Sequence, residues 1–238
     1  KAAKKSGRIA AEGSIFLVKN NKKTTMIEIN TETDFVVLNN LFVEESNKIA
    51  NAILNSNITN GDINEALALK YDGKSIESIL TNMTAIIGEK ISLRRFVSFD
   101  GLTGAYKHTN NRIGVIISGE SIDEIVLRDV AMHIAAMNPE FLIKDEISEE
   151  IIIKETKLVK IELADVLNGK PKNIQENIIQ GKVNKILLEG VLTEQTFVKD
   201  SSKKIKDLLG SGSFNSFVRY EVGEGIEKKE ENFAEEVA

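Results

Sequence analysis

The sequence predicts an α+β fold: a duplicated core of two subdomains with small antiparallel sheets and packed helices, plus an inserted antiparallel helical hairpin of the coiled-coil type. Three observations predict it. Apolar runs with strand composition flank Asn-Asn turns at 20–21 and 110–111. Stretches with helical spacing follow each pair of runs, so the same plan occurs twice. From 147 to 191 the strand signals are absent, and apolar residues recur at helical spacing alone.

The first unit begins with the run SIFLVKNNKKTTMIEINT from residue 14, which predicts a hairpin. Its asparagines, Asn20 and Asn21, suit the left-handed backbone that tight turns require. Helical patterns follow over about 41–54, through Ala66 and Leu69, and over about 76–86, and RRFVSF reads as a strand. The expected boundaries of these parts are 1–8 for a linker remnant and 9–101 for the core N-subdomain.

The second unit repeats the plan with the run AYKHTNNRIGVIISG, again a predicted hairpin. A helix is expected from about residue 122 to Met137, and Asn138 and Pro139 should end it. After the helical hairpin we expect a short helix at 203–209 and a last strand, SFVRYEV. The core C-subdomain is therefore placed at 102–140 and 190–224, and an acidic C-terminal module at 225–238.

The helical hairpin is placed at 141–189. The seven-residue spacing of Ile152, Val159 and Val166, and of Ile151 and Leu158, is the coiled-coil period. The residues of 168–171, which include Gly169 and Pro171, should break the first helix. A second helix is then predicted from the apolar positions Ile174, Ile178, Ile179, Val183, Ile186 and Leu187.

Composition limits the function classes. The chain has 238 residues, no cysteine and a formal net charge of −5 at pH 7. A negative net charge argues against a general nucleic-acid binder, and the absence of cysteine excludes a disulfide framework and a thiolate zinc site. The sequence contains no apolar run of about 20 residues, so we expect no membrane span. A cytoplasmic protein with a protein partner is the expectation.

Candidate catalytic groups are few. The sequence has two histidines. His133 lies among apolar residues and is expected to be a core residue, while His108 in the second hairpin is either an ordinary turn residue or a contact residue. The glycines of GSGS and GEGIEKK match no phosphate-binding loop, so we expect no nucleotide site. The acidic runs have no metal-ligand spacing, so no metal or other cofactor is predicted, although an enzyme with a carboxylate site is not excluded.

The stretch TETDFVVLNN places an acid and an aromatic side by side at the end of a strand. From composition alone, the favoured interpretation is structural: Phe35 covers the core and Asp34 caps the next helix. The alternative is that Thr33, Asp34, Phe35 and Val36 contact another molecule, because loops at the ends of strands tolerate exposed side chains.

Several phrases in order resemble the bacterial elongation factor Ts family over the whole chain. They are KAAKKSGRIAAEG, TDFV, IGEKISLRRF, RIGV, AMHIAA with NPEF, GKPKNIQENIIQGKVNK and FVRYEVGEGIEKKEENFAEEVA. The family exchanges guanine nucleotides on elongation factor Tu, so the resemblance implies a non-enzymatic exchange factor with that GTPase as partner. It also implies a ubiquitin-associated-like domain before KAAKK, which this sequence lacks, and hence weaker binding and reduced exchange than for the longer form.

The resemblance assigns roles to particular residues. Phe35 of TDFV would wedge between two helices of the GTPase, and Asp34 would disturb its magnesium and phosphate site. Further partner contacts implied by the family are Ile87, Gly88, His108, Phe233 and Val237. Val37 and Leu38 stand where Ala-Lys is usual, which removes a basic contact beside the wedge.

Two questions stay open at the sequence level. One alternative function is a stable scaffold or chaperone-like partner of the GTPase without strong exchange activity, although the complete TDFV motif favours exchange. The sequence also does not decide between a homodimer and a heterotetramer with the GTPase.

Overall fold

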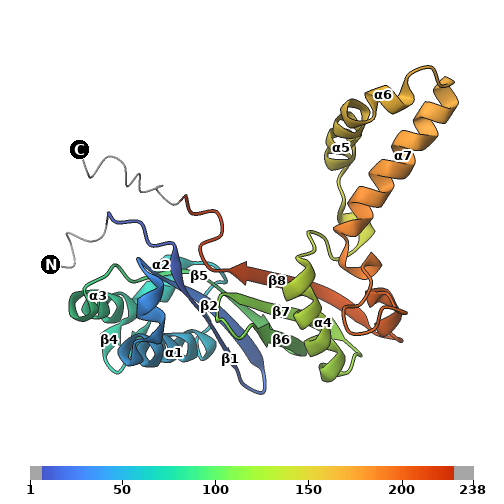
Figure 1. Ribbon diagram of the computed structural model, residues 1–238. Coiled ribbons are helices and arrows are strands. Elements are labelled where there is room, and N and C mark those ends of the chain that lie inside the picture. The colour runs from blue at the N-terminus through green and yellow to red at the C-terminus, as the bar shows by residue number, and fades with distance from the viewer. Residues whose placement is uncertain (1–6, 228–238) are drawn as a thin grey trace, which may run out of the picture.

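The computed structural model describes residues 7–227 and confirms the α+β class (Figure 1). The first sheet has the strand order β1-β2-β5, and the second has the order β6-β7-β8. The elements of the first part are β1 (Glu12–Lys19), β2 (Lys23–Thr31), the 3-10 helix η2 (Asp34–Leu38), α1 (Asn40–Leu54), α2 (Ile63–Ala68), β3 (Lys70–Tyr71), β4 (Lys74–Ser75), α3 (Ile76–Ile87) and β5 (Ser92–Asp100). Those of the second are β6 (Thr103–Lys107), β7 (Ile113–Glu120), α4 (Glu124–Met137), η3 (Lys144–Glu146), α5 (Glu149–Glu162), α6 (Ala164–Leu167), α7 (Lys172–Glu189), η4 (Leu192–Glu194), η5 (Ile205–Leu208) and β8 (Ser213–Glu221).

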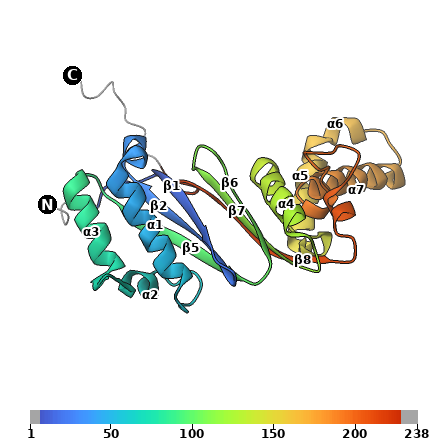
Figure 2. The same ribbon diagram turned by 90° about the horizontal axis from the view of Figure 1, so that it is seen from below.

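The core has four layers. In Figure 2, α1 and α3 cover the outer face of the first sheet, the two sheets lie face to face, and α4 covers the outer face of the second. Separate apolar clusters fill the three gaps between these layers. Phe16 and Phe42 meet edge to face, at 5.8 Å between ring centroids, in the gap under α1. The sheets therefore pack on each other while each keeps a helical cover of its own.

Strand β2 is buried on both faces, and it carries a glutamate in the gap between the sheets. The Glu28 side chain is fully buried and accepts hydrogen bonds from Asn30 Nδ2 at 2.9 Å and from the backbone N–H of Gly223 at 2.9 Å. Its other partners are Arg94 Nη1 at 3.2 Å and Arg95 Nε at 2.5 Å. The residues that directly follow β8 are thus hydrogen-bonded to a carboxylate of the first sheet.

A β-bulge explains why two consecutive arginines reach one carboxylate. Glu28 pairs with Arg95 and Ile29 pairs with Leu93, so Arg94 is the extra residue of β5. In a regular strand, neighbouring side chains point to opposite faces, and the bulge removes that alternation locally. Burial alone raises the pKa of Glu28, but the hydrogen bonds from Gly223 and Asn30 and the charge of Arg95 outweigh it, so its pKa lies below the ordinary value.

Arg95 of this buried ion pair also contacts the end of β8 and the residues that follow it. Arg95 Nη2 donates to the Glu221 carbonyl at 3.0 Å, and its guanidinium lies 4.1 Å from the ring centroid of Tyr220. Burial raises the pKa of Tyr220 to about 12, and the charge of Arg95 opposes this only in part. Gly223 has a φ of +79°, and a Cβ there would lie 2.2 Å from the Ala11 carbonyl oxygen, so only glycine fits.

His133 is a buried residue of α4, as expected. Its Nε2 lies 2.9 Å from Gln195 Oε1, and its Nδ1 accepts a hydrogen bond from the Val198 N–H at 3.3 Å. These partners require the neutral ring with the proton on Nε2. Desolvation lowers the pKa of His133, and the Gln195 hydrogen bond opposes this only in part. The histidine therefore joins α4 to the segment that follows the helical hairpin.

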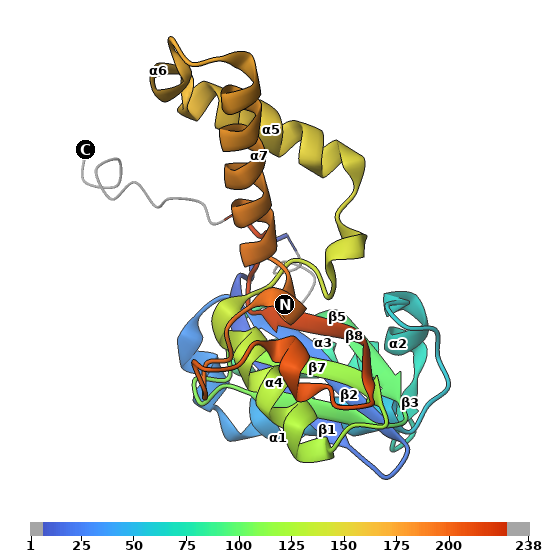
Figure 3. The same cartoon turned by 90° about the vertical axis from the view of Figure 1, so that its right-hand side faces the viewer.

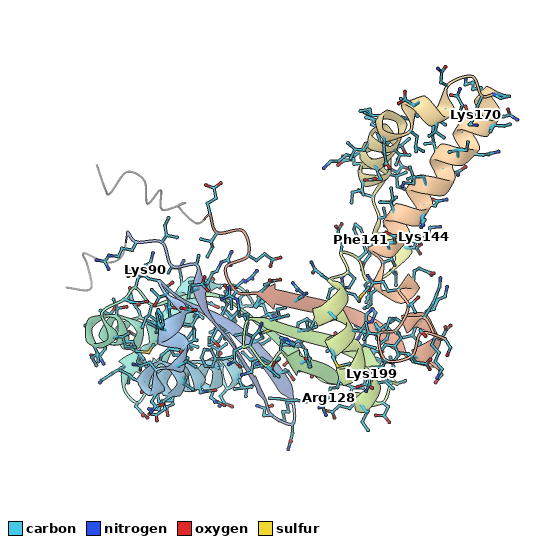
Figure 4. All side chains as sticks on the ribbon, in the orientation of Figure 1. Lys90, Arg128, Phe141, Lys144, Lys170 and Lys199 are labelled. Atoms are coloured by element: carbon cyan, nitrogen blue, oxygen red, sulfur yellow. The ribbon has the colours of Figure 1, made fainter. Side chains whose placement is uncertain are left out.

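The helical hairpin is confirmed as an element, and the predicted heptad position Val159 is buried, but other predicted heptad positions are not. Ile152, Leu158 and Val166 are 41%, 51% and 54% exposed. The buried positions are Val159, Leu167, Ile179 and Val183. Two physical reasons account for this. The first helix breaks at Leu163, between α5 and α6, and α5 lies across α7 instead of along it (Figure 3), so only a short stretch can pack. Phe141 and Lys144 lie at the base of this hairpin and Lys170 at its tip (Figure 4).

The predicted turns lie where expected, but only some of them have the predicted left-handed backbone. Asn111 has the predicted left-handed backbone, with φ +58°, and Asn138 ends α4 in the same conformation, with φ +44°. The first hairpin turn also lies where predicted, but neither Asn20 nor Asn21 has a positive φ. There the side chain acts instead, since Asn20 Oδ1 accepts from the N–H groups of Lys22 and Lys23 at 2.9 and 2.8 Å.

Replacing Glu28 by glutamine should destabilise the fold strongly. The change removes the charge that pairs with Arg94 and Arg95, and because both arginines are 25–26% exposed, the loss in the free energy of unfolding should lie near the lower end of the roughly 3–5 kcal/mol that breaking a buried pair costs. Urea denaturation measures it. Glu45→Gln, at the surface pair with Lys48 (2.8 Å), is the control and should leave the midpoint near that of the wild type. Equal midpoints for both variants would contradict the role of Glu28.

Stability should fall as the pH drops from about 7 to 5. His133 has a lowered pKa in the folded state, so the unfolded chain binds more protons below its own pKa of about 6.5, and protonation there favours unfolding. Thermal unfolding followed at several pH values should show a shallower pH dependence for His133→Gln. An unchanged slope in His133→Gln would refute the assignment.

Candidate functional site

The stretch after β2 forms a short 3-10 helix, η2, that presents an aromatic ring to solvent. Phe35 is 82% exposed and Asp34 is also exposed, whereas Val36 is buried in the core under α1. The structural interpretation of Phe35 as a core cover is therefore wrong, and Val36 takes that place. Asp34 does not cap α1 either, because the cap is Asn39, whose side chain accepts from the Phe42 N–H. Both residues are left free to contact another molecule.

Two glutamates hold this loop in place. Glu89 accepts from the Thr33 N–H at 2.9 Å and from the Thr33 hydroxyl at 2.6 Å. In return, Glu32 accepts from the Lys90 N–H at 2.6 Å and pairs with Arg8 at 3.2 Å. The strand end before Phe35 and the turn after α3 are thus joined by reciprocal carboxylate-to-backbone bonds. Figure 4 places Lys90 over the first unit, on the side away from the helical hairpin.

Ile87 and Gly88 lie at this clamp. Gly88 ends α3 with a φ of +93°, a left-handed conformation that favours glycine, and its N–H donates to the Thr84 carbonyl. Ile87 is half-buried against the core of the first unit, while the preceding Ile86 is 63% exposed. The helix end therefore turns sharply enough to bring Glu89 to Thr33. The structure brings the four TDFV residues together with Ile87 and Gly88, which are more than fifty positions away in the chain.

His108 lies in the exposed turn between β6 and β7. Its Nδ1 is 3.0 Å from the Tyr106 hydroxyl, and its carbonyl accepts from the Asn111 N–H at 2.9 Å. The same turn bonds to the first sheet, because the Asn111 carbonyl accepts from the Ile15 N–H at 2.8 Å. His108 also lines a hollow of about 340 Å³ whose apolar floor includes Ile113, Met132 and Ala136.

A chain of contacts places His108 and the Phe35 loop at the same end of the sheets. Thr31, which ends β2, pairs with Glu12 at the start of β1. The Glu12 carboxylate in turn pairs with Arg112, four positions after His108. The two exposed turns are therefore neighbours along one edge of the molecule, although they come from different sheets.

The remaining candidates do not add to this site. Phe233 and Val237 lie outside the described residues. His133 is buried beside Gln195 and is not part of the exposed edge. Within residues 7–227 no group of three histidine, aspartate or glutamate side chains has the geometry to hold a metal ion. In the same part of the chain, no helix is long and apolar enough to cross a lipid bilayer.

Sequence reasoning missed the residues that support the loop. Glu32 and Glu89 were not selected, although each directly flanks a selected motif in TETDFV and IGEK. No local signal marks either glutamate, because each carboxylate accepts from the backbone of a segment more than fifty positions away in the chain. What the site offers chemically is recognition: an aromatic ring and a carboxylate on a rigid exposed loop, with a histidine nearby.

Comparisons with known proteins identify relatives of the whole chain. The family described as "Elongation factor TS" matches residues 32–224. A protein named elongation factor Ts from Acholeplasma laidlawii (strain PG-8A) is 44% identical over 246 residues, which cover all of this chain and 82% of that protein. Proteins of the same name from Clostridium perfringens (strain SM101 / Type A) and Limosilactobacillus reuteri (strain DSM 20016) are 42% and 40% identical, again over all of this chain and over 83% and 82% of theirs.

Removing the Glu89 carboxylate should loosen the loop without unfolding the core. In Glu89→Ala, amide hydrogen exchange at residues 31–38 should become faster, since Thr33 loses both of its bonds to the α3 end. Glu176→Ala, at an exposed position of α7, is the matched control. If exchange in the loop is the same in the two variants, the clamp does not order the loop.

Proposed function

The chain belongs to the elongation factor Ts family, and from that premise we propose that it is a guanine nucleotide exchange factor that promotes release of GDP from elongation factor Tu. It acts by binding, not as an enzyme, in the cytoplasm. It binds no nucleotide itself and contacts neither nucleic acid nor membrane. The single observation that carries the proposal is the exposed ring of Phe35 beside Asp34 on a clamped loop.

Phe35 is suited to be a wedge. An exposed phenylalanine gains about 1.5–3 kcal/mol when it is buried, and this gain can stabilise a displaced arrangement of helices in the partner. The clamp by Glu89 matters here, because a loop that is already ordered loses little conformational entropy on binding. Such a gain is available only in the conformation of the GTPase that accepts the ring.

Asp34 acts on the nucleotide site through its charge. GTPases hold the phosphates with backbone N–H groups and a bound magnesium ion. A carboxylate brought close to that site repels the phosphates and competes for the cation, so the nucleotide is held less tightly. Asp34 is exposed directly next to Phe35, so the two side chains reach the partner together.

Linkage limits what the protein does. If its binding lowers the affinity of the GTPase for GDP by some factor, GDP lowers its own affinity for the GTPase by the same factor. The protein therefore accelerates exchange, and the nucleotide concentrations decide which nucleotide refills the site. Ile87, Gly88 and His108 are proposed as further contacts on the same edge, and Phe233 and Val237 as contacts of the C-terminal module at 225–238.

The second candidate function is a stable scaffold of the GTPase that does not promote release. It needs a binding surface but has no use for an exposed ring and acid at one point. We therefore place it second, and the experiment below separates the two functions.

Stopped-flow release of fluorescent GDP from elongation factor Tu tests the proposal. The wild-type protein should accelerate release, and Phe35→Ala should lose that acceleration about tenfold or more, from the burial of one aromatic side chain. Ile161→Ala is the matched control, because Ile161 is a 75% exposed apolar residue of the helical hairpin. Binding of the wild type without faster release would favour the scaffold function.

A further inference from the structure

The 3-10 helix η2 exposes a second large apolar residue besides Phe35. Leu38 is also 82% exposed, although it lies only three positions further along the chain. In a 3-10 helix, with three residues per turn, the side chains of residues i and i+3 eclipse each other. Phe35 and Leu38 therefore form one row along the outside of η2, while Val36 and Val37 pack against the core.

The row is held rigidly at its far end. The Asn39 N–H donates to the Val36 carbonyl at 2.9 Å and closes the last turn of η2. The Asn39 side chain accepts from the Phe42 N–H at 3.3 Å, and its carbonyl accepts from the Val43 N–H at 3.0 Å. Leu38 is thus fixed between the end of η2 and the first turn of α1, as Phe35 is fixed by the clamp at Thr33.

The stretch of chain that carries the row is uncharged between Asp34 and Glu44. Residues 35–43, FVVLNNLFV, contain no ionisable side chain. Val43 on α1 is 37% exposed, and Ile86 at the end of α3, three positions before the clamp residue Glu89, is 63% exposed. A surface that docks on this stretch meets the Asp34 carboxylate at its start, and the next charged side chain along the chain is the exposed Glu44 on α1.

We infer that Leu38 is a second partner-contact residue, which enters the same apolar cleft of the GTPase as Phe35 and makes the protein selective for a cleft without an acidic group at that point. This inference rests on the proposed exchange function. The two exposed side chains are presented by one rigid turn, so a partner cleft that buries Phe35 also meets Leu38. An uncharged leucine cannot pair with a carboxylate in the cleft, and burying an unpaired carboxylate against it would be unfavourable.

A double-mutant cycle tests this inference with the full chain. The variants are Phe35→Ala, Leu38→Ala and the double variant, and the measured quantities are the dissociation constant for nucleotide-free elongation factor Tu and the rate of GDP release. Leu38→Ala should weaken binding about tenfold, as expected for loss of one buried leucine contact. The double variant should lose less than the product of the two single effects, because the residues share one cleft.

Two further variants sharpen the result. Leu38→Lys should weaken binding at least as much as Leu38→Ala, since it places a charge in the apolar cleft, and Ile161→Ala should bind like the wild type. All variants change exposed side chains, so their thermal unfolding should match that of the wild type.

The inference and the proposed function fail in different ways. If Phe35→Ala is defective while Leu38→Ala and Leu38→Lys bind and release like the wild type, Leu38 makes no contact and the inference is overturned. Tighter binding by Leu38→Lys would show an acidic cleft and overturn the selectivity. If the wild type neither binds the GTPase nor accelerates release, the proposed function itself falls, and the inference with it.

Discussion

The buried carboxylate of Glu28 is the interaction on which the arrangement of the two units depends. It lies on β2, faces the second sheet and gathers Arg94, Arg95, Asn30 and the N–H of Gly223. A charge in that gap would be strongly unfavourable if any of these partners were absent. Apolar packing between two sheets is tolerant of small rotations, whereas this set of directed bonds is not. The end of β8 is therefore held at one position on the first sheet.

This rigid frame is what makes an exposed ring useful. Phe35 and His108 belong to turns of different sheets, so their separation is constant only if the sheets do not move relative to each other. The bonds from Asn111 to Ile15 and from Arg112 to Glu12 join the second turn to the start of β1. The clamp between Glu32, Glu89 and the backbone then sets the loop of Phe35 on the same frame. A recognition surface built from single residues needs this order, because each would otherwise lose conformational entropy on binding.

In the helical hairpin the helices were predicted correctly, but the way in which they pack on each other was not. Its helices follow from local spacing, but a heptad pattern assumes that two helices stay side by side over several turns. Here α5 breaks at Leu163 and lies across α7, so Ile152 and Val166 have no partner helix along the described part of the chain. The chain leaves the core and returns to it at Phe141 and Val191, which form an isolated bridge.

The sequence by itself determined the α+β class, the two hairpins, the end of α4 at Asn138, and the place of the TDFV motif at the joint after a strand, because these follow from periodicity and turn chemistry within a few residues. Tertiary structure alone decided that Val36 and not Phe35 enters the core, and that Glu89 holds Thr33. It also decided that the Glu28 carboxylate pairs with two arginines at a bulge and accepts a hydrogen bond from the N–H of Gly223, 195 positions away. The physical reason is that these contacts join distant segments. Whether a polar or apolar side chain is satisfied depends on partners that folding brings together, and local spacing carries no information about them.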